Sequence, residues 1–247
     1  MIGVDIIINS KQFALPGLRS PKTVIADFAL TIPPGQFVCL IGPSGCGKST
    51  LLHAVAGLDP DFSGAIRFPG GPPVPRLGYM FQDPRLLPWR TVRQNIELAL
   101  STPEASRPLI DHLLEVMGLH NAQHEFPERL SLGMSRRVAL ARAFAIEPDL
   151  LLMDEPFVSL DAATARRVRK LLLRVWAERR HTVLFVTHDL REAVVLADRL
   201  VFLSASPMRV VRDLEIDLPR QHRIEDTTIE QLITELVKRH PEIAVAV

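Results

Sequence analysis

The feature that most constrains how this chain can fold is a glycine-rich stretch at residues 42–50. It reads Gly-Pro-Ser-Gly-Cys-Gly-Lys-Ser-Thr and fills every fixed position of the phosphate-loop pattern G-x-x-x-x-G-K-[ST]. The apolar run at 37–41 predicts a buried strand before it, and the pattern at 51–56 predicts a helix after it that ends near Gly57. A strand that leads through such a loop into a helix requires an α/β fold.

The residues of this loop suit a chain of phosphates. Glycine lets the backbone turn several N–H groups inward, and the start of the following helix adds partial positive charge. The side chain of Lys48 can reach the terminal phosphates, and the hydroxyl of Ser49 can bind Mg²⁺. An ordinary glycine-rich turn is the alternative, but it would not require all the fixed residues. The residues expected to bind a nucleoside triphosphate here are Gly42, Pro43, Ser44, Gly45, Cys46, Gly47, Lys48, Ser49 and Thr50.

Composition narrows the class of protein. The chain has 247 residues, 47% apolar and 23% charged, as in a globular protein with a substantial core. Its formal net charge of +1 gives no general basic field, so we expect no nucleic-acid partner. The only cysteines, Cys39 and Cys46, suggest neither a disulfide framework nor a metal site, which suits a reducing cytosol. We also see no membrane-spanning run and no signal peptide, so a role at a membrane would need another chain to cross it.

Hydrophobic patterns divide the chain into an α/β core and an inserted helical region. Strand-like runs occupy residues 4–8, 24–41, 65–68, 77–81, 150–153 and 182–186. Helical spacing of apolar residues occupies 92–100, 109–117, 136–146 and 162–180. The sequence therefore predicts one domain across 1–247, with a core at 1–82 and 148–205, a helical subdomain at 83–147 and a C-terminal extension at 206–247.

The extension has weaker signals. Short strand-like pieces occur at 209–212 and 214–218. A last helix is expected from Thr227, where Thr227 and Glu230 have the spacing of a capping box.

Two carboxylates end the apolar run at 150–153. Asp154 is placed to hold Mg²⁺ through water, as in a Walker B strand, and Glu155 to orient or deprotonate an attacking water. Two acids after a strand can also be a solvated turn. Their occurrence together with the phosphate loop favours the functional interpretation.

Further segments resemble the ATP-binding cassette (ABC) ATPases and occur in the order of that family's motifs. The matching residues are Gln82 for the Q-loop, Leu130–Met134 for the LSGGQ signature, Ser159–Asp161 for the D-loop and Thr187–Asp189 for the switch histidine. The resemblance extends over residues 4–205. It implies a P-loop NTPase fold of the α/β class, with a RecA-like parallel-sheet core, an antiparallel β subdomain and an inserted helical subdomain.

The resemblance also implies a site shared between two copies. Each ATP with its Mg²⁺ would lie between the phosphate loop of one cassette and the signature helix of the other. Ser131 and Gly133 would then contact the γ-phosphate held by the partner copy. The residue types agree with this role, because Ser131 can cap the helix that follows and leave N–H groups for an anion.

Other roles follow from the same resemblance. Gln82 would sense Mg²⁺ and the attacking water, and His188 would hydrogen-bond the γ-phosphate, although a lone histidine after a strand is otherwise an ordinary packed residue. Asp161 would contribute to the nucleotide contacts. Phe13 resembles the aromatic residue that stacks on adenine, where the family more often has tyrosine; a buried core phenylalanine is the alternative. The expected catalytic residues are Glu155, His188, Gln82 and Lys48, and the expected metal ligands are Ser49, Gln82 and Asp154.

The signature segment departs from the family pattern. The usual signature has Gly where this chain has Leu132, Gln where it has Met134, and Gln where it has Arg136. A leucine side chain at a close backbone approach would slow closure of the two cassettes. We therefore expect a competent but slower ATPase.

One segment indicates which ABC proteins the chain resembles. Leu86, Leu87 and Trp89 lie where the family docks the coupling helix of a transmembrane partner, although they could instead fill the seam beside the helical subdomain. The string Leu86-Leu-Pro-Trp89, together with Asp217-Leu-Pro-Arg220 in the tail, is similar to the ATPases of nitrate, sulfonate and taurine importers.

This resemblance predicts an ATPase subunit that energises a membrane importer for a small organic or inorganic anion. The expected partners are a second copy of the chain, an integral membrane permease and, indirectly, a periplasmic or extracellular solute-binding protein. The expected location is peripheral, on the cytoplasmic face of the inner membrane. A soluble non-transport ABC ATPase and an importer ATPase for another small solute, such as a thiamine precursor, are the alternatives.

Overall fold

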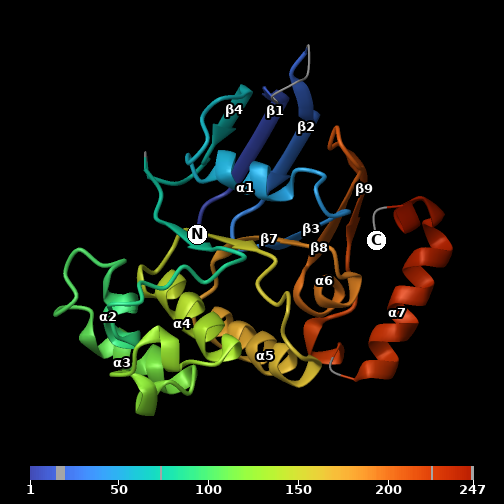
Figure 1. Ribbon diagram of the computed structural model, residues 1–247. Coiled ribbons are helices and arrows are strands. Elements are labelled where there is room, and N and C mark those ends of the chain that lie inside the picture. Colours follow the sequence, from blue (N-terminus) through green and yellow to red (C-terminus); the bar gives the residue numbers. More distant parts are fainter. Residues whose placement is uncertain (15–19, 73, 224, 246–247) are drawn as a thin grey trace. The chain divides into compact units, whose positions relative to one another are not determined.

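The strands drawn in Figure 1 are of two kinds. Some have apolar residues at alternate positions, and others are apolar throughout. The computed structural model describes residues 1–14, 20–72, 74–223 and 225–245. The chain forms two compact units, the first made of residues 1–73 and 182–247 and the second of residues 74–181.

An antiparallel sheet with the strand order β2-β1-β4 lies in the first unit. Its strands are β1 (Val4–Phe13), β2 (Lys22–Ile32) and β4 (Ser63–Arg67). In β1 the side chains of Ile6 and Ile8 are fully buried, whereas Ile7 between them is 45% exposed. This is the two-residue period of a sheet with one face on the core, and it confirms the predicted antiparallel part of the fold.

Continuous apolar runs form the parallel strands of the same unit. β3 (Phe37–Ile41) lies between β7 (Thr182–Thr187) and β8 (Arg199–Leu203) and runs parallel to both. Every residue of β3 and β7 is buried, as expected for strands covered on both faces. β9 (Val210–Glu215) joins β8 in the antiparallel direction and is more exposed.

In the first unit, α1 (Lys48–Val55) follows β3 and α6 (Leu190–Leu196) follows β7, whereas the remaining helical elements come after β9. These are α7 (Asp226–Arg239) and the 3₁₀ turns η3 (Arg220–His222) and η4 (Pro241–Val245). α1 ends at the expected glycine, since Gly57 has a left-handed φ of 70°. α6 packs against β3 and β7, and α7 packs against α6 (Figure 1).

The second unit combines two parallel strands with most of the helices. Its elements are β5 (Leu77–Met80), α2 (Val92–Glu97), α3 (Arg107–Val116), η1 (His120–Ala122), η2 (Pro127–Arg129), α4 (Leu132–Ala145), β6 (Leu150–Asp154) and α5 (Ala162–Glu178). β5 pairs with β6, and α4 contacts α2, α3 and α5. The helical subdomain boundaries at 83 and 147 remain a prediction. In the described part of the chain as a whole, no helix is both long and apolar enough to span a bilayer.

The C-terminal region differs from its sequence-based prediction. The two pieces expected at 209–212 and 214–218 form one strand, β9, because residues 210–215 pair with β8. The predicted capping box of Thr227 and Glu230 is wrong. α7 begins at Asp226 without a side-chain cap, and the carboxylate of Glu230 pairs with Arg191 instead. The short elements α6 and β8 were not predicted.

His181, the residue before β7, is buried among aromatic side chains. It is 4% exposed, its ring centroid lies 5.7 Å from that of Phe144, and its carbonyl oxygen accepts a hydrogen bond from Trp176 Nε1 at 2.9 Å. Burial lowers the pKa of His181 from 6.5 to about 4.

We predict that His181 makes the fold sensitive to acid. Between pH 6.5 and about 4 the unfolded chain binds a proton at this residue that the folded chain excludes, so the free energy of unfolding falls across that window as the pH falls. His181→Phe should reduce the pH dependence of the urea midpoint between these limits, whereas His124→Phe, at an exposed position, should not. An unchanged dependence in His181→Phe would contradict this role.

Candidate active site

The phosphate loop has the local geometry that its sequence predicts. It leaves the buried end of β3 and enters α1, whose N-cap is Gly47 with a left-handed φ of 118°. Gly47 supplies no side-chain cap, and the first turn of α1 holds no acidic residue. The helix start therefore presents N–H donors and partial positive charge to an anion.

The glycines of the loop are required by close approach as well as by conformation. A Cβ atom on Gly47 would lie 2.8 Å from Val24 Cγ1, and one on Gly42 would lie 3.0 Å from Leu203 Cβ. Gly45 also has a positive φ, of 76°, although a Cβ there would meet nothing within 4 Å. The loop is thus shaped by neighbouring strands β2 and β8 as well as by its own sequence.

Lys48 is folded over the loop. It is 4% exposed, and its Nζ donates hydrogen bonds to the carbonyl oxygens of Gly42 at 2.7 Å and Pro43 at 3.1 Å. The ammonium group is therefore held directly above the backbone that would surround a phosphate. This charge, the glycine cradle and the uncapped helix start fit a triphosphate.

The switch-histidine segment begins at the same edge of the sheet as the loop. Ile41 of β3 is in register with Thr187 of β7, so Gly42 and His188 follow adjacent parallel strands. Thr187 Oγ1 donates to Glu192 Oε2 at 2.9 Å and accepts from the backbone N–H of Asp189 at 3.0 Å. These bonds lie on both sides of His188, whose side chain is exposed.

Asp189 caps the helix that follows His188. Its Oδ1 accepts from the backbone N–H groups of Arg191 at 2.8 Å and Glu192 at 3.3 Å. The position of α6 therefore sets the conformation of the segment that carries His188.

Phe13 is not a core residue, so that alternative is wrong. Its side chain is 37% exposed, and Lys11 Nζ lies 4.7 Å from the ring centroid. Lys11 is buried, and its Nζ donates to Asp59 Oδ1 at 2.7 Å and to the carbonyl oxygen of Asp61 at 2.6 Å. Adenine stacking by Phe13 remains a prediction.

In the second unit, the two carboxylates after β6 lie in different environments. Asp154 is 5% exposed, whereas the next residue, Glu155, is partly exposed and has a left-handed φ of 42°. A turn closed by the Val158 N–H on the Glu155 carbonyl oxygen, at 3.2 Å, follows. The backbone conformation at Glu155 is one that non-glycine residues seldom adopt, and it gives the two side chains different directions.

The signature segment contacts the D-loop helix inside the same unit. Ser131 caps α4, its Oγ accepting from the Met134 N–H at 3.2 Å. A Cβ on Gly133 would lie 2.5 Å from Thr164 Cγ2, and the Thr164 N–H is itself bound by Asp161 Oδ1 at 3.0 Å. Hydrogen bonds from the side chain and then the backbone of Thr164 lower the pKa of Asp161. Gly133 is thus required by the packing of α4 against α5, independently of any nucleotide.

Two arginines of α4, Arg136, which is buried, and Arg142, which is partly exposed, organise the Q-loop, and neither was expected to have this role. Arg136 donates to the carbonyl oxygens of Phe81, at 3.5 Å, and Val158, at 3.4 Å. Arg142 donates to those of Pro84, at 2.6 Å, and Arg85, at 3.0 Å. Gln82 itself is exposed. The available signal was the presence of three arginines, at 136, 137 and 142, on a helix of mostly apolar residues.

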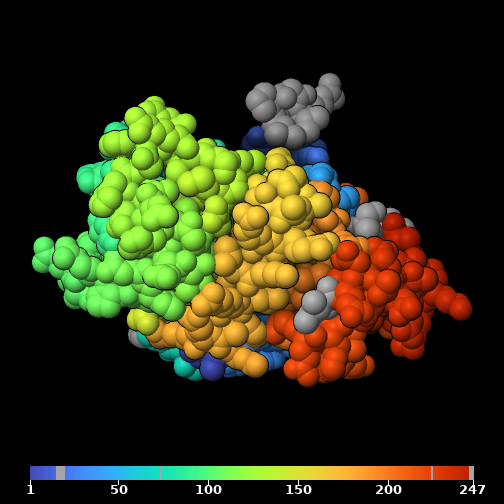
Figure 2. Space-filling model, turned by 90° about the horizontal axis from the view of Figure 1, so that it is seen from below, coloured from blue at the N-terminus to red at the C-terminus, as the bar shows by residue number. Residues whose placement is uncertain are grey.

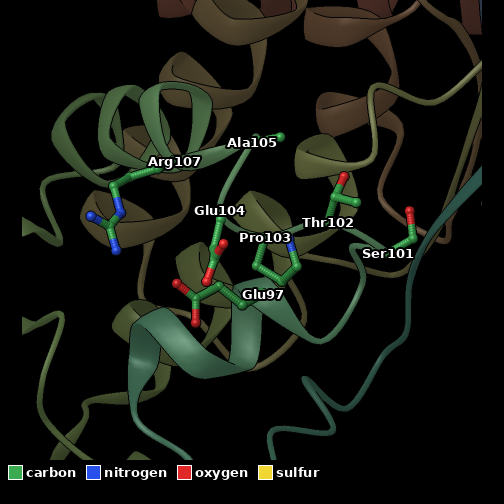
Figure 3. A pocket seen from close by; sticks show the side chains of 7 residues that line it. All are labelled: Glu97, Ser101, Thr102, Pro103, Glu104, Ala105 and Arg107. Atoms are coloured by element: carbon green, nitrogen blue, oxygen red, sulfur yellow. The ribbon is translucent and has the colours of Figure 1, made fainter.

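One pocket of the second unit is unrelated to these motifs (Figure 3). It lies between the end of α2 and the start of α3 and is lined by Glu97, Ser101, Thr102, Pro103, Glu104, Ala105 and Arg107. Two of these residues are acidic, which does not suit a triphosphate.

The loop between β3 and α1, with Lys48 folded over it, defines a P-loop nucleotide-binding protein. A family model described as ABC transporter matches residues 25–158. The aliphatic sulfonates import ATP-binding protein SsuB of Bacillus licheniformis is 46% identical over 224 residues, which are 88% of this chain and 86% of that protein. The nitrate import ATP-binding protein NrtD of Synechococcus elongatus is 45% identical over 240 residues, 91% of this chain and 86% of that protein.

A solved structure supports the same fold. The dimeric ATP-binding cassette MJ0796, in a post-hydrolysis state bound to ADP and phosphate, matches 87% of this chain and 100% of its own, with a TM-score of 0.73 and 27% identity. This chain belongs to the ABC transporter family as an ATP-binding subunit, and ATPase activity is that family's chemistry. The predicted fold class and resemblance are confirmed.

We predict that Gly47→Ala weakens nucleotide binding, because the new methyl group would meet Val24 at 2.8 Å and strain a φ of 118° at the start of α1. Calorimetric titration with ATP should show at least a tenfold loss of affinity, equivalent to about 1.4 kcal/mol. Gly57→Ala is the matched control, since it also places alanine at a positive φ but in open space. It should lower stability by roughly 1 kcal/mol and leave ATP binding unchanged. Equal affinities in both variants would contradict the proposed cradle.

Proposed function

We propose that this chain is the ATP-hydrolysing subunit of a membrane importer for a small anion of the nitrate, sulfonate or taurine type. The observation that carries this proposal is the identity of 45–46%, along most of the chain, to ATP-binding proteins of aliphatic sulfonate and nitrate import. In this proposal the chain acts as a homodimer at the cytoplasmic face of the inner membrane. Its partners are an integral permease and, indirectly, an extracellular or periplasmic solute-binding protein.

The loop after Gln82 supports a membrane partner. Trp89 is 68% exposed, while Leu86 and Leu87 are half-buried. The fully buried side chain of Asn95 holds this loop through hydrogen bonds to the backbone of Leu87, Arg90 and Thr91. A large aromatic side chain on such an ordered loop suits docking of an apolar helix. A non-transport ABC ATPase would not need this surface, and an importer for another small solute would use it in the same way.

The proposed mechanism assigns a role to each predicted catalytic and metal-binding residue. Lys48 and the loop N–H groups bind the β- and γ-phosphates of ATP. Mg²⁺, held by Ser49, Gln82 and Asp154, would neutralise phosphate charge. Glu155 orients the attacking water and accepts its proton, and His188 hydrogen-bonds the γ-phosphate. The partner copy supplies Ser131 and Gly133, so that binding of ATP closes two cassettes and hydrolysis releases them.

Glu155→Gln tests this scheme. The amide cannot accept the proton of the attacking water, so ATP should be bound but not hydrolysed, and the closed dimer should persist. We expect ATPase activity to fall by roughly a hundredfold or more and an ATP-dependent dimer to elute in gel filtration with light scattering. Lys48→Ala is the control, because it removes the phosphate-binding cation and should form no such dimer. A monomer in Glu155→Gln with ATP demonstrably bound, or normal turnover in Lys48→Ala, would contradict the proposal.

Leu132 tests whether the altered signature limits turnover. Its side chain is 43% exposed at the first position of α4, next to the proposed contacts of Ser131 and Gly133. Removal of this bulk in Leu132→Gly should raise the turnover of the chain with its permease by roughly fivefold, about 1 kcal/mol of barrier. Leu132→Ala also removes the large side chain, but it keeps the helix propensity that glycine loses. It therefore separates the effect of side-chain size from that of backbone flexibility. Unchanged turnover in both variants would show that Leu132 does not slow closure.

A further inference from the structure

The tail motif Asp217-Leu-Pro-Arg220 has no part in the mechanism above. It leads through η3 to Arg223, and the side chains of Arg220 and Arg223 both return to α6. α6 is the helix whose N-cap, Asp189, directly follows His188. Figure 2 shows the C-terminal segment, orange to red, at the surface of the molecule.

Arg223 holds the C-terminal end of α6. It is 4% exposed, and its Nη1 donates to the carbonyl oxygens of Val194 at 2.9 Å and Ala197 at 2.5 Å. Its Nε and Nη2 donate to the carbonyl oxygens of Leu218, at 2.6 Å, and Ile216, at 3.4 Å. The last carbonyl groups of a helix lack hydrogen-bond donors within the helix and carry partial negative charge. The guanidinium group of Arg223 supplies both the donors and a positive charge.

Arg220 connects the same helix end to the strand before the phosphate loop. Its Nε donates to the carbonyl oxygen of Leu196 at 2.6 Å, and its Nη2 lies 2.8 Å from Asp198 Oδ2. The same carboxylate oxygen accepts from the N–H of Phe37, the first residue of β3, at 2.9 Å.

The start of α6 is held by the tail as well. Arg191 forms ion pairs with Asp226, at 2.6 Å, and with Glu230, both on α7. The tail therefore contacts α6 at both ends of a helix of seven residues. A helix this short has little stability of its own and depends on such contacts for its position.

We propose that residues 216–223 and 225–230 form a clamp that positions His188 through α6, with Arg223, Arg220 and Arg191 as positioning residues for ATP hydrolysis. The proposal rests on the role given to His188 above. Displacement of α6 would move Asp189, which caps it, and Glu192, which binds Thr187. Asp189 and Thr187 are the two neighbours of His188 in the chain. The phosphate loop lies outside these contacts, so the clamp should act on the hydrolytic step more than on ATP affinity.

The test compares variants of the full chain. Arg223→Met keeps the apolar stem of the side chain but removes its hydrogen-bond donors, and Arg191→Ala removes a partly exposed link that the fold tolerates more readily. Arg239→Ala is the matched control, because Arg239 pairs with Glu235 on its own helix. We expect kcat to fall roughly tenfold in Arg223→Met and threefold in Arg191→Ala, the ATP dissociation constant to change less than about twofold, and Arg239→Ala to match the wild type.

Two further readouts separate positioning from a general loss of stability. In a His188→Ala background, Arg223→Met should cause little additional loss of kcat, because both changes act on one group. Amide hydrogen exchange should accelerate in residues 190–197 and not in α1.

The outcomes are distinct. Unchanged kcat in Arg191→Ala and Arg223→Met, or a full additional loss in the His188→Ala background, overturns the clamp. If Arg223→Met does not fold, Arg191→Ala decides. Equal turnover in the wild type and His188→Ala would overturn the role of His188, and with it the path by which the clamp acts.

Discussion

The parallel pairing of β3 with β7 is the constraint on which the rest of the site depends. It sets Ile41 opposite Thr187, so that the phosphate loop and His188 leave the sheet together. Both strands are buried on each face, which explains why their residues are apolar without alternation. Polar chemistry is therefore confined to the carboxyl ends of the strands, where the backbone turns away from the sheet.

In the second unit the strands are also apolar, and arginine side chains bind the backbone of the segments that follow them. Arg136 and Arg142 point from α4 to backbone carbonyl oxygens around Gln82 and beyond Glu155. In the first unit Arg223 does the same for α6. A buried guanidinium group bound to carbonyl oxygens joins segments that have no regular structure of their own, because its five donors are arranged in a rigid plane. Loops that carry functional residues are thus held by arginines that were not expected to contact them.

The strands, the main helices and the order of the motifs could be predicted because their signals are local. A continuous apolar run or a three- and four-residue period is visible without knowledge of partners. The predictions were wrong where the structure of a segment depends on a residue far from it in the sequence. The carboxylate of Glu230 forms an ion pair with Arg191 and does not cap α7. β9 is one continuous strand because it pairs with β8 along its length. Gly133 was assigned to the nucleotide alone, whereas its contact with Thr164 depends on how two helices cross. The roles of Arg136 and Arg223 could not be predicted either. Their partners are backbone carbonyl oxygens, which every residue has, so the sequence does not indicate which of them an arginine will bind.

Lys48 has a consequence for the energetics of the loop. Its ammonium group is already bound to the carbonyl oxygens of Gly42 and Pro43, so the loop acts as an internal competitor of the nucleotide. Lys48 therefore contributes to affinity only the difference in free energy between its hydrogen bonds to phosphate and its hydrogen bonds to the loop carbonyl oxygens. A partnered charge also spares the loop the cost of a buried, unpaired cation between successive nucleotides. The chain can therefore release its product without leaving an unpaired ammonium group in the loop, and these two hydrogen bonds are exchanged for bonds to phosphate when the next nucleotide binds.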